Sequence, residues 1–386
     1  MRIGIACHET VGGSGTLAVS LAQALASYGH GVHLIARDCP LRLEPDRLPH
    51  GLRLHRYGCF DYPPIGTAQY ALTLASKLAE VAWAERLDLL HVHYAVPHAV
   101  SAYLAREMLR GRHRLPIVTT LHGTDVTIVG NDPSYHAVTR FALAQCNGLT
   151  AVSHYLADQI DRNFQLPGVR VIPNFVNPDL FQRGTDDSGL RSSLAPRGQK
   201  LLIHVSNFRP VKQVGQCVEV LARLARCIPC RLVMVGDGPE TRTAHERARQ
   251  LGVEHDVLFV GVQSRIEDYL SVADLLLLPS QTESFGLAAL EAMSCEVPVI
   301  ASAVGGLPEV IEDRVTGRLL PPGDIEGMAA AAVEILTNRD LHQAMGQACR
   351  SRVLALFNAN RVVPLYLDDY RQVIDRLDSG RALHLG

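Results

Sequence analysis

Residues 274–293 read D-L-L-L-L-P-S-Q-T-E-S-F-G-L-A-A-L-E-A-M, and this stretch decides the fold. The leucine run that ends at Leu278 predicts a strand buried on both faces, as in parallel sheets. The segment from Gly286 to Met293 has helical spacing, and Glu283 stands in the turn between strand and helix. A strand, a short loop and a helix form part of a βαβ unit, so this stretch predicts a parallel sheet covered by helices.

The same rhythm of short apolar runs and amphipathic stretches extends along the whole chain, which is typical of doubly wound α/β domains. Strands are predicted at 3–7, 32–36, 89–93, 117–122, 149–153, 201–205, 232–235, 257–260, 274–278 and 297–301. The sequence becomes mostly polar after Phe181, and a new apolar run starts at Leu201. We therefore predict two Rossmann-like domains, 1–182 and 183–358, that face a central cleft. A helix within 359–386 is expected to complete the first domain.

Length and composition limit the classes of function. With 386 residues, the chain is long enough for two domains with separate cores. A formal net charge of −2 argues against a nucleic-acid partner bound by bulk electrostatics. The N-terminus has no signal-peptide pattern, and no apolar run approaches the ~18–20 residues of a membrane-spanning helix. The nine scattered cysteines are typical of reduced thiols, so we expect a cytoplasmic protein without a membrane partner.

A glycine-rich segment, Gly12 to Gly15, lies between the first predicted strand and an Ala/Leu-rich helix. Glycines there allow close approach of a ligand, and the amides at a helix N-terminus suit an anion. The spacing of Gly13, Gly15 and Ala18, with Asp38 further on, also satisfies a loose dinucleotide pattern. Because the turn before it is longer than a dinucleotide turn, a nicotinamide cofactor is the weaker interpretation.

Two carboxylates and two cations in the second half indicate a ligand with hydroxyls and phosphates. Glu283 and Glu291 can accept hydrogen bonds from hydroxyls at two points of one molecule, while the amides of 285–287 face an anion. Arg209 and Lys212 follow the first strand of the second domain and suit a diphosphate. Because these residues follow strand ends, they are expected at the edge where open α/β sheets bind ligands.

The histidines at 91, 93 and 98 raise the alternative of a metal site. His91 and His93 are two residues apart at the end of a predicted strand, so both point to one face, and His98 follows Pro97. A metal would need a third ligand at the right distance and chemistry that uses it. We expect no metal here, and a scaffold that supports Tyr94.

The motifs in the second half resemble those of retaining GT-B glycosyltransferases of family four. The resemblance rests on E-S-F-G-L-A-A-L-E at 283–291, R-P-V-K at 209–212, V-G-D-G-P-E at 235–240 and P-N-F at 173–175. It implies that Glu283 binds the transferred sugar, that Glu291 binds the nucleotide ribose, and that Arg209 and Lys212 neutralise the diphosphate. The donor site implied by the resemblance comprises Gly13, Arg209, Lys212, Val262, Glu283, Ser284, Phe285, Gly286, Leu287 and Glu291.

The first half resembles one branch of that family, which transfers N-acetylglucosamine from UDP-N-acetylglucosamine to L-malate at the start of bacillithiol biosynthesis. The matching motifs are T-V-G-G-S-G at 10–15, L-H-V-H-Y-A-V-P-H-A at 90–99, T-T-L-H-G-T-D-V-T at 119–127 and D-P-S at 132–134. The resemblance implies that His122 contacts the donor sugar and is catalytic together with Arg209, Lys212 and Glu283. It also implies an acceptor pocket formed by Ser14, Tyr94, Thr120, Asn207 and Arg209.

The resemblance also implies a mechanism. Reaction would proceed with retention, and the diphosphate would take the acceptor proton while attack occurs on the same face. Since no D-x-D precedes a strand end in the metal-binding manner, neither a metal nor another cofactor is expected. A homodimer is implied by the resemblance alone. The alternatives are an inositol-phosphate acceptor, a UDP-N-acetylglucosamine 2-epimerase, a nicotinamide dehydrogenase and a non-catalytic sugar-binding module.

Overall fold

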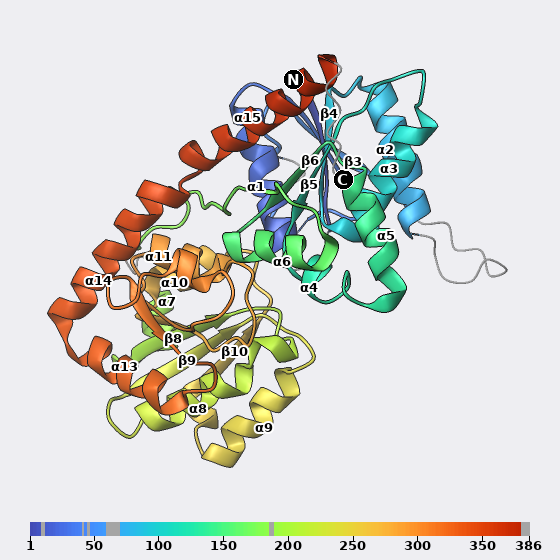
Figure 1. Cartoon of the computed structure of the whole chain (residues 1–386). Coiled ribbons are helices and arrows are strands. Elements are labelled where there is room, and N and C mark those ends of the chain that lie inside the picture. The colour runs from blue at the N-terminus through green and yellow to red at the C-terminus, as the bar shows by residue number, and fades with distance from the viewer. Residues whose placement is uncertain (9–11, 41, 45–46, 59–69, 185–188, 380–386) are drawn as a thin grey trace. The chain divides into compact units, whose positions relative to one another are not determined.

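The computed structural model describes residues 1–8, 12–40, 42–44, 47–58, 70–184 and 189–379. The chain folds into two compact units, one made of Met1–Pro173 together with the segment from Asn360, the other of Asn174–Ala359 (Figure 1). Each unit contains one parallel sheet with helices packed against it, so the predicted fold class of two Rossmann-like α/β domains is confirmed.

The sheet of the first unit has seven parallel strands in the order β3-β2-β1-β4-β5-β6-β7. The strands are β1 Arg2–Ala6, β2 Gly31–Ala36, β3 Leu52–Arg56, β4 Leu89–His93, β5 Ile117–Leu121, β6 Gly148–Ala151 and β7 Arg170–Val171. The connecting helices are α1 Gly13–Ser27, α2 Tyr70–Ala84, η3 Ala95–Ala99, α3 Val100–Met108, α4 Thr124–Thr127, α5 Pro133–Ala144 and α6 His154–Phe164. Strands β4 and β5 are buried along their whole length, which explains their continuous apolar runs.

Helix starts in this unit follow local capping chemistry. The Asp132 carboxylate accepts a hydrogen bond from the Ser134 amide at 2.9 Å, and Pro133 occupies the first helical position of α5. The Ser153 hydroxyl oxygen accepts from the Leu156 amide at 3.2 Å and starts α6. These caps satisfy amides that have no partner within the helix, so the sequence sets where both helices begin.

The sheet of the second unit has six parallel strands in the order β10-β9-β8-β11-β12-β13. They are β8 Lys200–Val205, β9 Cys230–Val235, β10 Val257–Gly261, β11 Leu275–Leu278, β12 Val299–Ser302 and β13 Gly317–Leu320. The helices are α7 Leu190–Leu194, η4 Pro210–Lys212, α8 Val214–Leu224, α9 Thr241–Leu251, η5 Glu254–Asp256, α10 Ile266–Val272, α11 Leu287–Ser294, α12 Leu307–Val310, α13 Ile325–Thr337, α14 Arg339–Arg352 and η6 Val353–Phe357.

Strand order reverses once in each sheet, between β1 and β4 in the first unit and between β8 and β11 in the second. The connections from such neighbouring strands run to opposite sides, which leaves a crevice at their carboxyl ends where open α/β sheets bind ligands. The glycine-rich segment at 12–15 follows β1, and Tyr94 follows β4. In the second unit, Lys212 follows β8 and Glu283 follows β11. Both predicted sets of site residues therefore lie at switch points.

Helix α15, Ala359–Asp378, belongs to the first unit although it ends the described chain (Figure 1). The Tyr370 hydroxyl forms a 2.6 Å hydrogen bond with His91 Nδ1 in β4, and the Arg170 guanidinium pairs with Asp368 at 2.7 Å and Asp369 at 3.5 Å. Residues 380–386 of the segment expected at 359–386 lie outside the described part.

The first unit ends at Pro173, earlier than the expected boundary between 182 and 183. The segment after it is bound to the second unit by backbone groups. The Phe181 carbonyl oxygen accepts from the Ser294 hydroxyl and from Arg350 Nη1, both at 2.6 Å, and the Pro178 carbonyl oxygen accepts from Arg350 Nη2 at 2.9 Å. The boundary between the units therefore precedes the polar stretch after Phe181, and the described residues of that stretch belong to the second unit.

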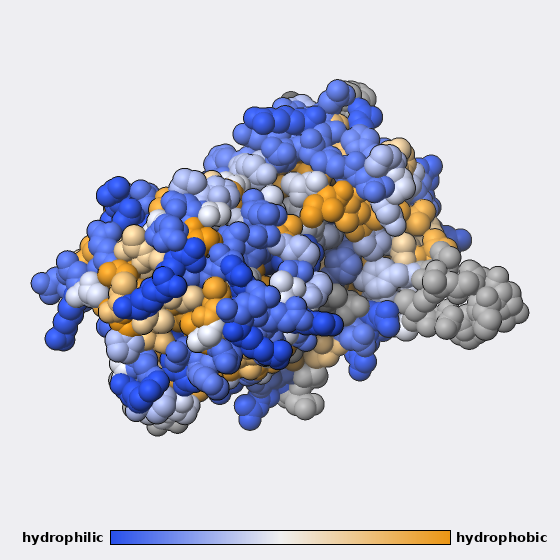
Figure 2. Space-filling model, turned by 90° about the horizontal axis from the view of Figure 1, so that it is seen from below, coloured by the Kyte–Doolittle hydropathy of each residue, from blue (hydrophilic) through white to orange (hydrophobic). Residues whose placement is uncertain are grey.

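Among the described residues, none of the helices is both long and apolar enough to cross a bilayer. On the face shown in Figure 2, hydrophilic side chains predominate and the apolar ones gather in separate small patches. None of the eight described cysteines forms a disulfide.

Candidate active site

The loops after β8 and β11 are joined by an ion pair in the second unit. Lys212 Nζ donates to Glu283 Oε2 at 2.5 Å, and both side chains are mostly buried. The Gln281 amide donates to the Val211 carbonyl oxygen at 2.8 Å, which fixes the backbones of the two loops to each other. Lys212 and Glu283 are 71 residues apart in sequence, and both were predicted to be catalytic. The structure brings the ammonium and the carboxylate into direct contact.

Two glycines allow a third loop to support Glu283. A Cβ at Gly305 would lie 1.8 Å from the Glu283 carbonyl oxygen, and a Cβ at Gly306 would lie 2.2 Å from the Ser284 carbonyl oxygen. The Gly306 amide donates to the Glu283 carbonyl oxygen at 2.9 Å. The loop between β12 and α12 therefore packs backbone against backbone beneath the Glu283 loop, which only glycine permits.

A similar contact supports Asn207. A Cβ at Gly236 would lie 1.8 Å from the Ser206 carbonyl oxygen, and a Cβ at Gly238 would lie 2.1 Å from that of Asn207. The Asn207 side-chain oxygen is buried and has no hydrogen-bond partner in the described part of the chain. A buried acceptor without a partner favours a ligand that donates a hydrogen bond there.

His204 is a component of this site that the sequence analysis missed. Its Nδ1 donates to the Leu277 carbonyl oxygen at 2.8 Å, so Nε2 accepts from the Ser206 hydroxyl, also at 2.8 Å. Burial lowers the pKa of His204 to about 4, which keeps the ring neutral. The ring links the ends of β8 and β11 and lies near the charges of Lys212 and Glu283. The only sequence pattern that indicates this role of His204 is a histidine two residues before a serine at a strand end.

The other predicted residues of this unit lie around the same strand ends. Arg209 is half-buried and, among the described residues, has no ion-pair partner, unlike Lys212. Gly286 has φ 97° and caps α11, so the amides of Phe285 and Leu287 lie at its start. Glu291 is 3% exposed on α11. Val262 directly follows β10 and is 43% exposed, whereas Ser284 is half-buried.

In the first unit, the glycine-rich segment forms the start of α1. Gly12 is extended, Gly13 is the first helical residue and is exposed, and Ser14 is half-buried beside it. The first turn contains no acidic side chain, so its amides can bind an anion. Of the motif at 10–15, residues 10 and 11 lie outside the described part of the chain.

Tyr94 has a left-handed backbone, with φ 96°, directly after β4. Its hydroxyl forms a short hydrogen bond with the Thr124 hydroxyl. The His122 ring stacks on Tyr94 at 6.1 Å between ring centroids, and the His8 ring packs edge-on at 5.2 Å. This geometry directs Tyr94, His122 and His8 to the same edge of the sheet.

The histidines of β4 are tied to protein partners. His91 Nδ1 bonds to Tyr370 and His91 Nε2 bonds to the Thr120 hydroxyl at 2.7 Å, so neither nitrogen is available to a metal. His93 Nδ1 lies 2.9 Å from His122 Nε2. Burial is the main cause that lowers the pKa of His91 and of His122 to about 3, and it also lowers the pKa of His93 and His98. The four rings are therefore neutral near pH 7.

Thr120 does not fit the predicted contact with an acceptor. Its side chain is fully buried, and its hydroxyl forms hydrogen bonds with His91 at 2.7 Å and with the Thr150 hydroxyl at 2.6 Å. The hydroxyl oxygens of Thr120 and Thr150 therefore both have hydrogen-bond partners inside the first unit. We therefore correct the role of Thr120 from ligand contact to support for β4.

Asp125 is a second residue missed from the sequence. Its carboxylate accepts from the amides of Gly123 at 2.8 Å, His122 at 3.2 Å and Ala95 at 3.2 Å. Burial raises the pKa of Asp125 to about 6, although these amides lower it. The carboxylate thereby fixes the segments that carry His122 and Tyr94. The H-G-T-D sequence at 122–125 is the signal that could have shown this role.

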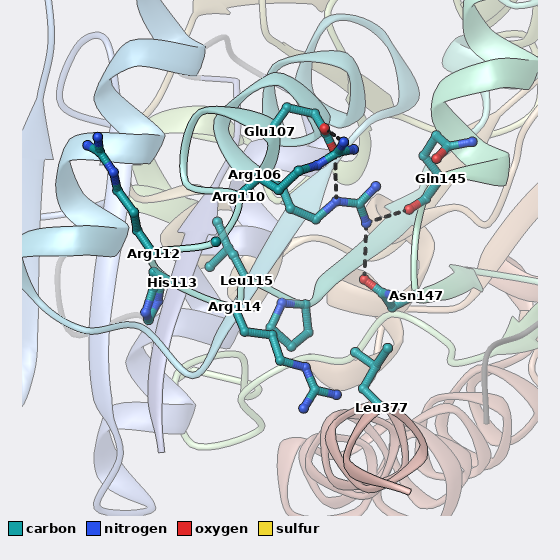
Figure 3. A pocket seen from close by; sticks show the side chains of 12 residues that line it. Arg106, Glu107, Arg110, Arg112, His113, Arg114, Leu115, Gln145, Asn147 and Leu377 are labelled. Atoms are coloured by element: carbon teal, nitrogen blue, oxygen red, sulfur yellow. Dashed lines mark hydrogen bonds and ion pairs between the residues drawn. The ribbon is translucent and has the colours of Figure 1, made fainter. Parts of the chain in front are cut away.

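A pocket of about 670 Å³ lies elsewhere in the first unit, at the amino ends of β5 and β6 (Figure 3). Its arginines make local contacts: Arg106 donates to the Gln145 carbonyl oxygen at 2.8 Å, and Arg114 pairs with Asp378 at 2.5 Å. Figure 3 shows the Arg112 guanidinium pointing away from that of Arg114. The pocket contains none of the predicted site residues, and we give it no part in the chemistry.

The fold and these two sets of residues define a class of enzyme. Two Rossmann-like units, with a carboxylate, an ammonium and a guanidinium at one switch point, are typical of GT-B glycosyltransferases. A family model described as Glycosyltransferase Family 4 matches residues 11–180, and one described as Glycosyl transferases group 1 matches residues 188–352. The chain belongs to family 4 of the GT-B glycosyltransferases and is a nucleotide-sugar-dependent transferase.

Among relatives, the chain is 41% identical to N-acetyl-alpha-D-glucosaminyl L-malate synthase of Bacillus anthracis over 97% of both proteins. It is 28% identical to D-inositol 3-phosphate glycosyltransferase of Kribbella flavida over 87% of this chain and 85% of that protein. Among solved structures, sucrose-phosphate synthase from Thermosynechococcus elongatus matches with a TM-score of 0.77, 25% identity and coverage of 97% of this chain and 100% of that one. The Anabaena HepE complex with UDP and glucose matches with a TM-score of 0.78, 20% identity and coverage of 98% and 100%.

Proposed function

We propose that the protein transfers N-acetylglucosamine from UDP-N-acetylglucosamine to the hydroxyl of L-malate, with retention at the anomeric carbon. The observation that carries this proposal is the 41% identity over nearly the full length to a synthase of that product. The product is the one expected for the first step of bacillithiol biosynthesis, so a cytoplasmic location is part of the proposal.

The residues of the second unit are proposed to hold the donor. Glu283 would accept hydrogen bonds from sugar hydroxyls, Glu291 from the ribose, and the backbone near Val262 would contact uracil. Arg209 supplies a half-buried guanidinium without an ion-pair partner among the described residues, which suits the diphosphate. Lys212 would supply the second positive charge while it holds Glu283 in place. The amides from Phe285 to Leu287, at the start of α11, would face the leaving oxygen.

The residues of the first unit are proposed to hold the acceptor and the sugar. Malate carries two carboxylates and one hydroxyl, so it requires hydrogen-bond donors. The amides at Gly13 and the Ser14 hydroxyl at the start of α1 provide such donors, as does the Tyr94 hydroxyl. Asn207 and Arg209 are further proposed contacts. His122, neutral because burial lowers its pKa, would contact the donor sugar through the nitrogen that does not face His93.

The proposed reaction needs no protein nucleophile. The bond between the anomeric carbon and the β-phosphate oxygen breaks, and the malate hydroxyl oxygen bonds to that carbon from the same face. The hydroxyl proton moves to the departing diphosphate. Arg209, Lys212 and the α11 amides would stabilise the negative charge that develops on the leaving oxygen, which is the part of the barrier a fixed cation lowers most.

We also propose that transfer is independent of metal, because Arg209 and Lys212 would neutralise the diphosphate in place of a divalent ion. Activity is expected to be unchanged after treatment with EDTA. Loss of activity in EDTA that Mg²⁺ or Mn²⁺ restores would contradict this part of the proposal.

The proposed function is tested by incubating the protein with UDP-N-acetylglucosamine and a panel of acceptors that contains L-malate, D-malate, succinate, D-lactate and inositol 3-phosphate. We expect release of UDP with L-malate and little with succinate, which has no hydroxyl to glycosylate. Release of UDP with inositol phosphate but not with malate would replace the acceptor while leaving the donor unchanged.

Tyr94→Phe tests the acceptor pocket. Since the ring stays in place and only the hydroxyl is lost, the KM for malate is expected to rise about 10-fold. The KM for UDP-N-acetylglucosamine should change little. A malate KM equal to that of the wild type would remove Tyr94 from the pocket.

A further inference from the structure

Two histidines and a glutamate outside the proposed transfer site form a compact group in the first unit. His33 lies in β2, His55 in β3, and Glu85 directly after α2. One nitrogen or oxygen atom from each residue lies within 4.8 Å of the others. His33 Nδ1 is 2.9 Å from His55 Nε2, and His33 Nε2 is 4.0 Å from Glu85 Oε2.

The parallel register explains why the two rings meet. In the pairing of β2 with β3, His33 lies opposite Arg53 and Ile35 lies opposite His55. Side chains two residues apart on a strand share a face, so Arg53 and His55 both point to the same face as His33. The chain after α2 returns to this face and brings Glu85 to it.

We propose that His33, His55 and Glu85 form a binding site for a divalent transition metal of the zinc class. Two imidazole nitrogens and one carboxylate oxygen are a ligand set that Zn²⁺ accepts, with a water molecule in the fourth tetrahedral position. Tetrahedral ligand atoms at zinc lie about 3.3 Å apart, so the three groups need only modest side-chain rotations to bind.

The protonation state of the rings supports binding. Burial is the first cause that lowers the pKa of His33 and of His55, so both rings are neutral near pH 7 and each carries one lone pair. In the pair, one nitrogen carries the shared proton. When a metal takes its place, this proton moves to the other nitrogen of the same ring, and no net deprotonation is required.

The charges around the group set its affinity. Arg53 Nη1 lies 3.2 Å from Glu85 Oε2 and competes directly with a metal for that carboxylate. Arg2 and Lys77 add positive charge near the rings, and Glu80 adds negative charge. Because Arg53 is exposed and belongs to the edge strand, it can move aside when an ion binds.

The proposal does not rest on the proposed function, and its test is a binding measurement. Zn²⁺ is titrated by calorimetry into tag-free, EDTA-treated and desalted protein, and the shift of the melting temperature is measured in parallel. The variants are His55→Gln, Glu85→Gln and Arg53→Gln. His50→Gln, which removes an exposed histidine of the same unit, is the control.

We expect the wild type and His50→Gln to bind one zinc ion with equal affinity. His55→Gln and Glu85→Gln should bind at least about 10-fold more weakly and lose the rise in melting temperature. Arg53→Gln should bind more tightly than the wild type, because it removes the competing cation. Equal zinc affinity in the wild type, His55→Gln and Glu85→Gln would overturn the proposal. If His55→Gln fails to fold, the other two variants test the site: Glu85→Gln should bind zinc more weakly and Arg53→Gln more tightly than the wild type. The same change of zinc affinity in both variants would contradict the proposal.

Discussion

Lys212 Nζ and Glu283 Oε2 lie 2.5 Å apart, so the only lysine at the switch point of the described second unit also holds the carboxylate that we propose to be catalytic. Removal of Lys212 therefore has two effects, since it deletes a positive charge and releases Glu283. For Lys212→Ala we expect kcat to fall by at least about 100-fold, as when one donor to a developing anion is lost. The measurement is UDP release at saturating substrates.

Lys200→Ala is the matched control for Lys212→Ala, because Lys200 lies at the opposite end of the same strand, β8. We expect it to retain the kcat of the wild type. Lys212→Ala should still fold, but at a lower melting temperature than the wild type, because the mostly buried Glu283 carboxylate loses its ion-pair partner. A Lys212→Ala variant with full turnover would exclude Lys212 from the catalytic machinery.

Gly306 offers a steric test of the loop beneath Glu283. Its φ is negative, so alanine costs no backbone strain, but the new methyl group would lie 2.2 Å from the Ser284 carbonyl oxygen. Gly306→Ala must displace the backbone that carries Glu283, and we expect kcat/KM for the donor to fall at least about 100-fold. Gly215→Ala in α8 meets open space and should retain full activity. Equal kinetics in the two variants would show that this packing does not position Glu283.

Most of the sheet could be predicted from the sequence because buried parallel strands are continuous apolar runs. Strands β4 and β11 are fully buried, and the predicted ranges match within one residue. Strand β3 was missed because it is an edge strand in which only Leu52 is buried, so R-L-H-R has no apolar signature. Strand β7 is two residues long, and β13 begins at Gly317, where a Cβ would lie 2.1 Å from the Val299 carbonyl oxygen. Their pairing depends on neighbours that the local sequence does not reveal.

Candidate residues could be identified from the sequence where a motif lies on one loop, as at 283–291. Contacts between residues of distant loops could not be predicted. The Asp125 carboxylate accepts hydrogen bonds from amides of its own loop and from the amide of Ala95. These hydrogen bonds can form together only after β4 and β5 have paired. The acceptor contact expected of Thr120 was implied by the family resemblance alone. The buried position of Thr120 against His91 follows from the sheet, since no local pattern tells which face of a fully buried strand meets the ligand.

Helix α15 is attached to the first unit through Tyr370, whose hydroxyl bonds to buried His91 Nδ1 at 2.6 Å. Tyr370→Phe leaves that nitrogen without a partner, so the free energy of unfolding should fall by about 1–3 kcal/mol. Tyr366→Phe, one turn earlier and equally buried, removes a hydroxyl that forms no hydrogen bond with His91, and it should cost much less. Trp83, the single tryptophan, lies in the same unit and reports denaturant unfolding by fluorescence. Equal losses in both variants would contradict a specific role for the Tyr370 hydroxyl.

Acid should destabilise the first unit through its buried histidines. Burial lowers the pKa of His91 from 6.5 to about 3. Between pH 3 and pH 6.5 the His91 ring is therefore protonated in the unfolded chain and neutral in the folded chain. The stability that depends on neutral His91 is therefore present above pH 6.5 and is lost as pH falls. At pH 5 this single group should lower the free energy of unfolding by about 2 kcal/mol relative to neutral pH. Asp125, whose raised pKa acts in the opposite direction, offsets part of the total.

The share of His91 is measured by comparing the pH dependence of Trp83-detected unfolding between pH 5 and 7.5 in wild type and His91→Gln. Glutamine does not titrate, so the variant should be less stable at pH 7.5 and should lose less stability on acidification than the wild type. His50→Gln, which removes an exposed histidine, should retain the pH dependence of the wild type. An identical pH dependence in wild type and His91→Gln would mean that protonation of this ring is not coupled to unfolding.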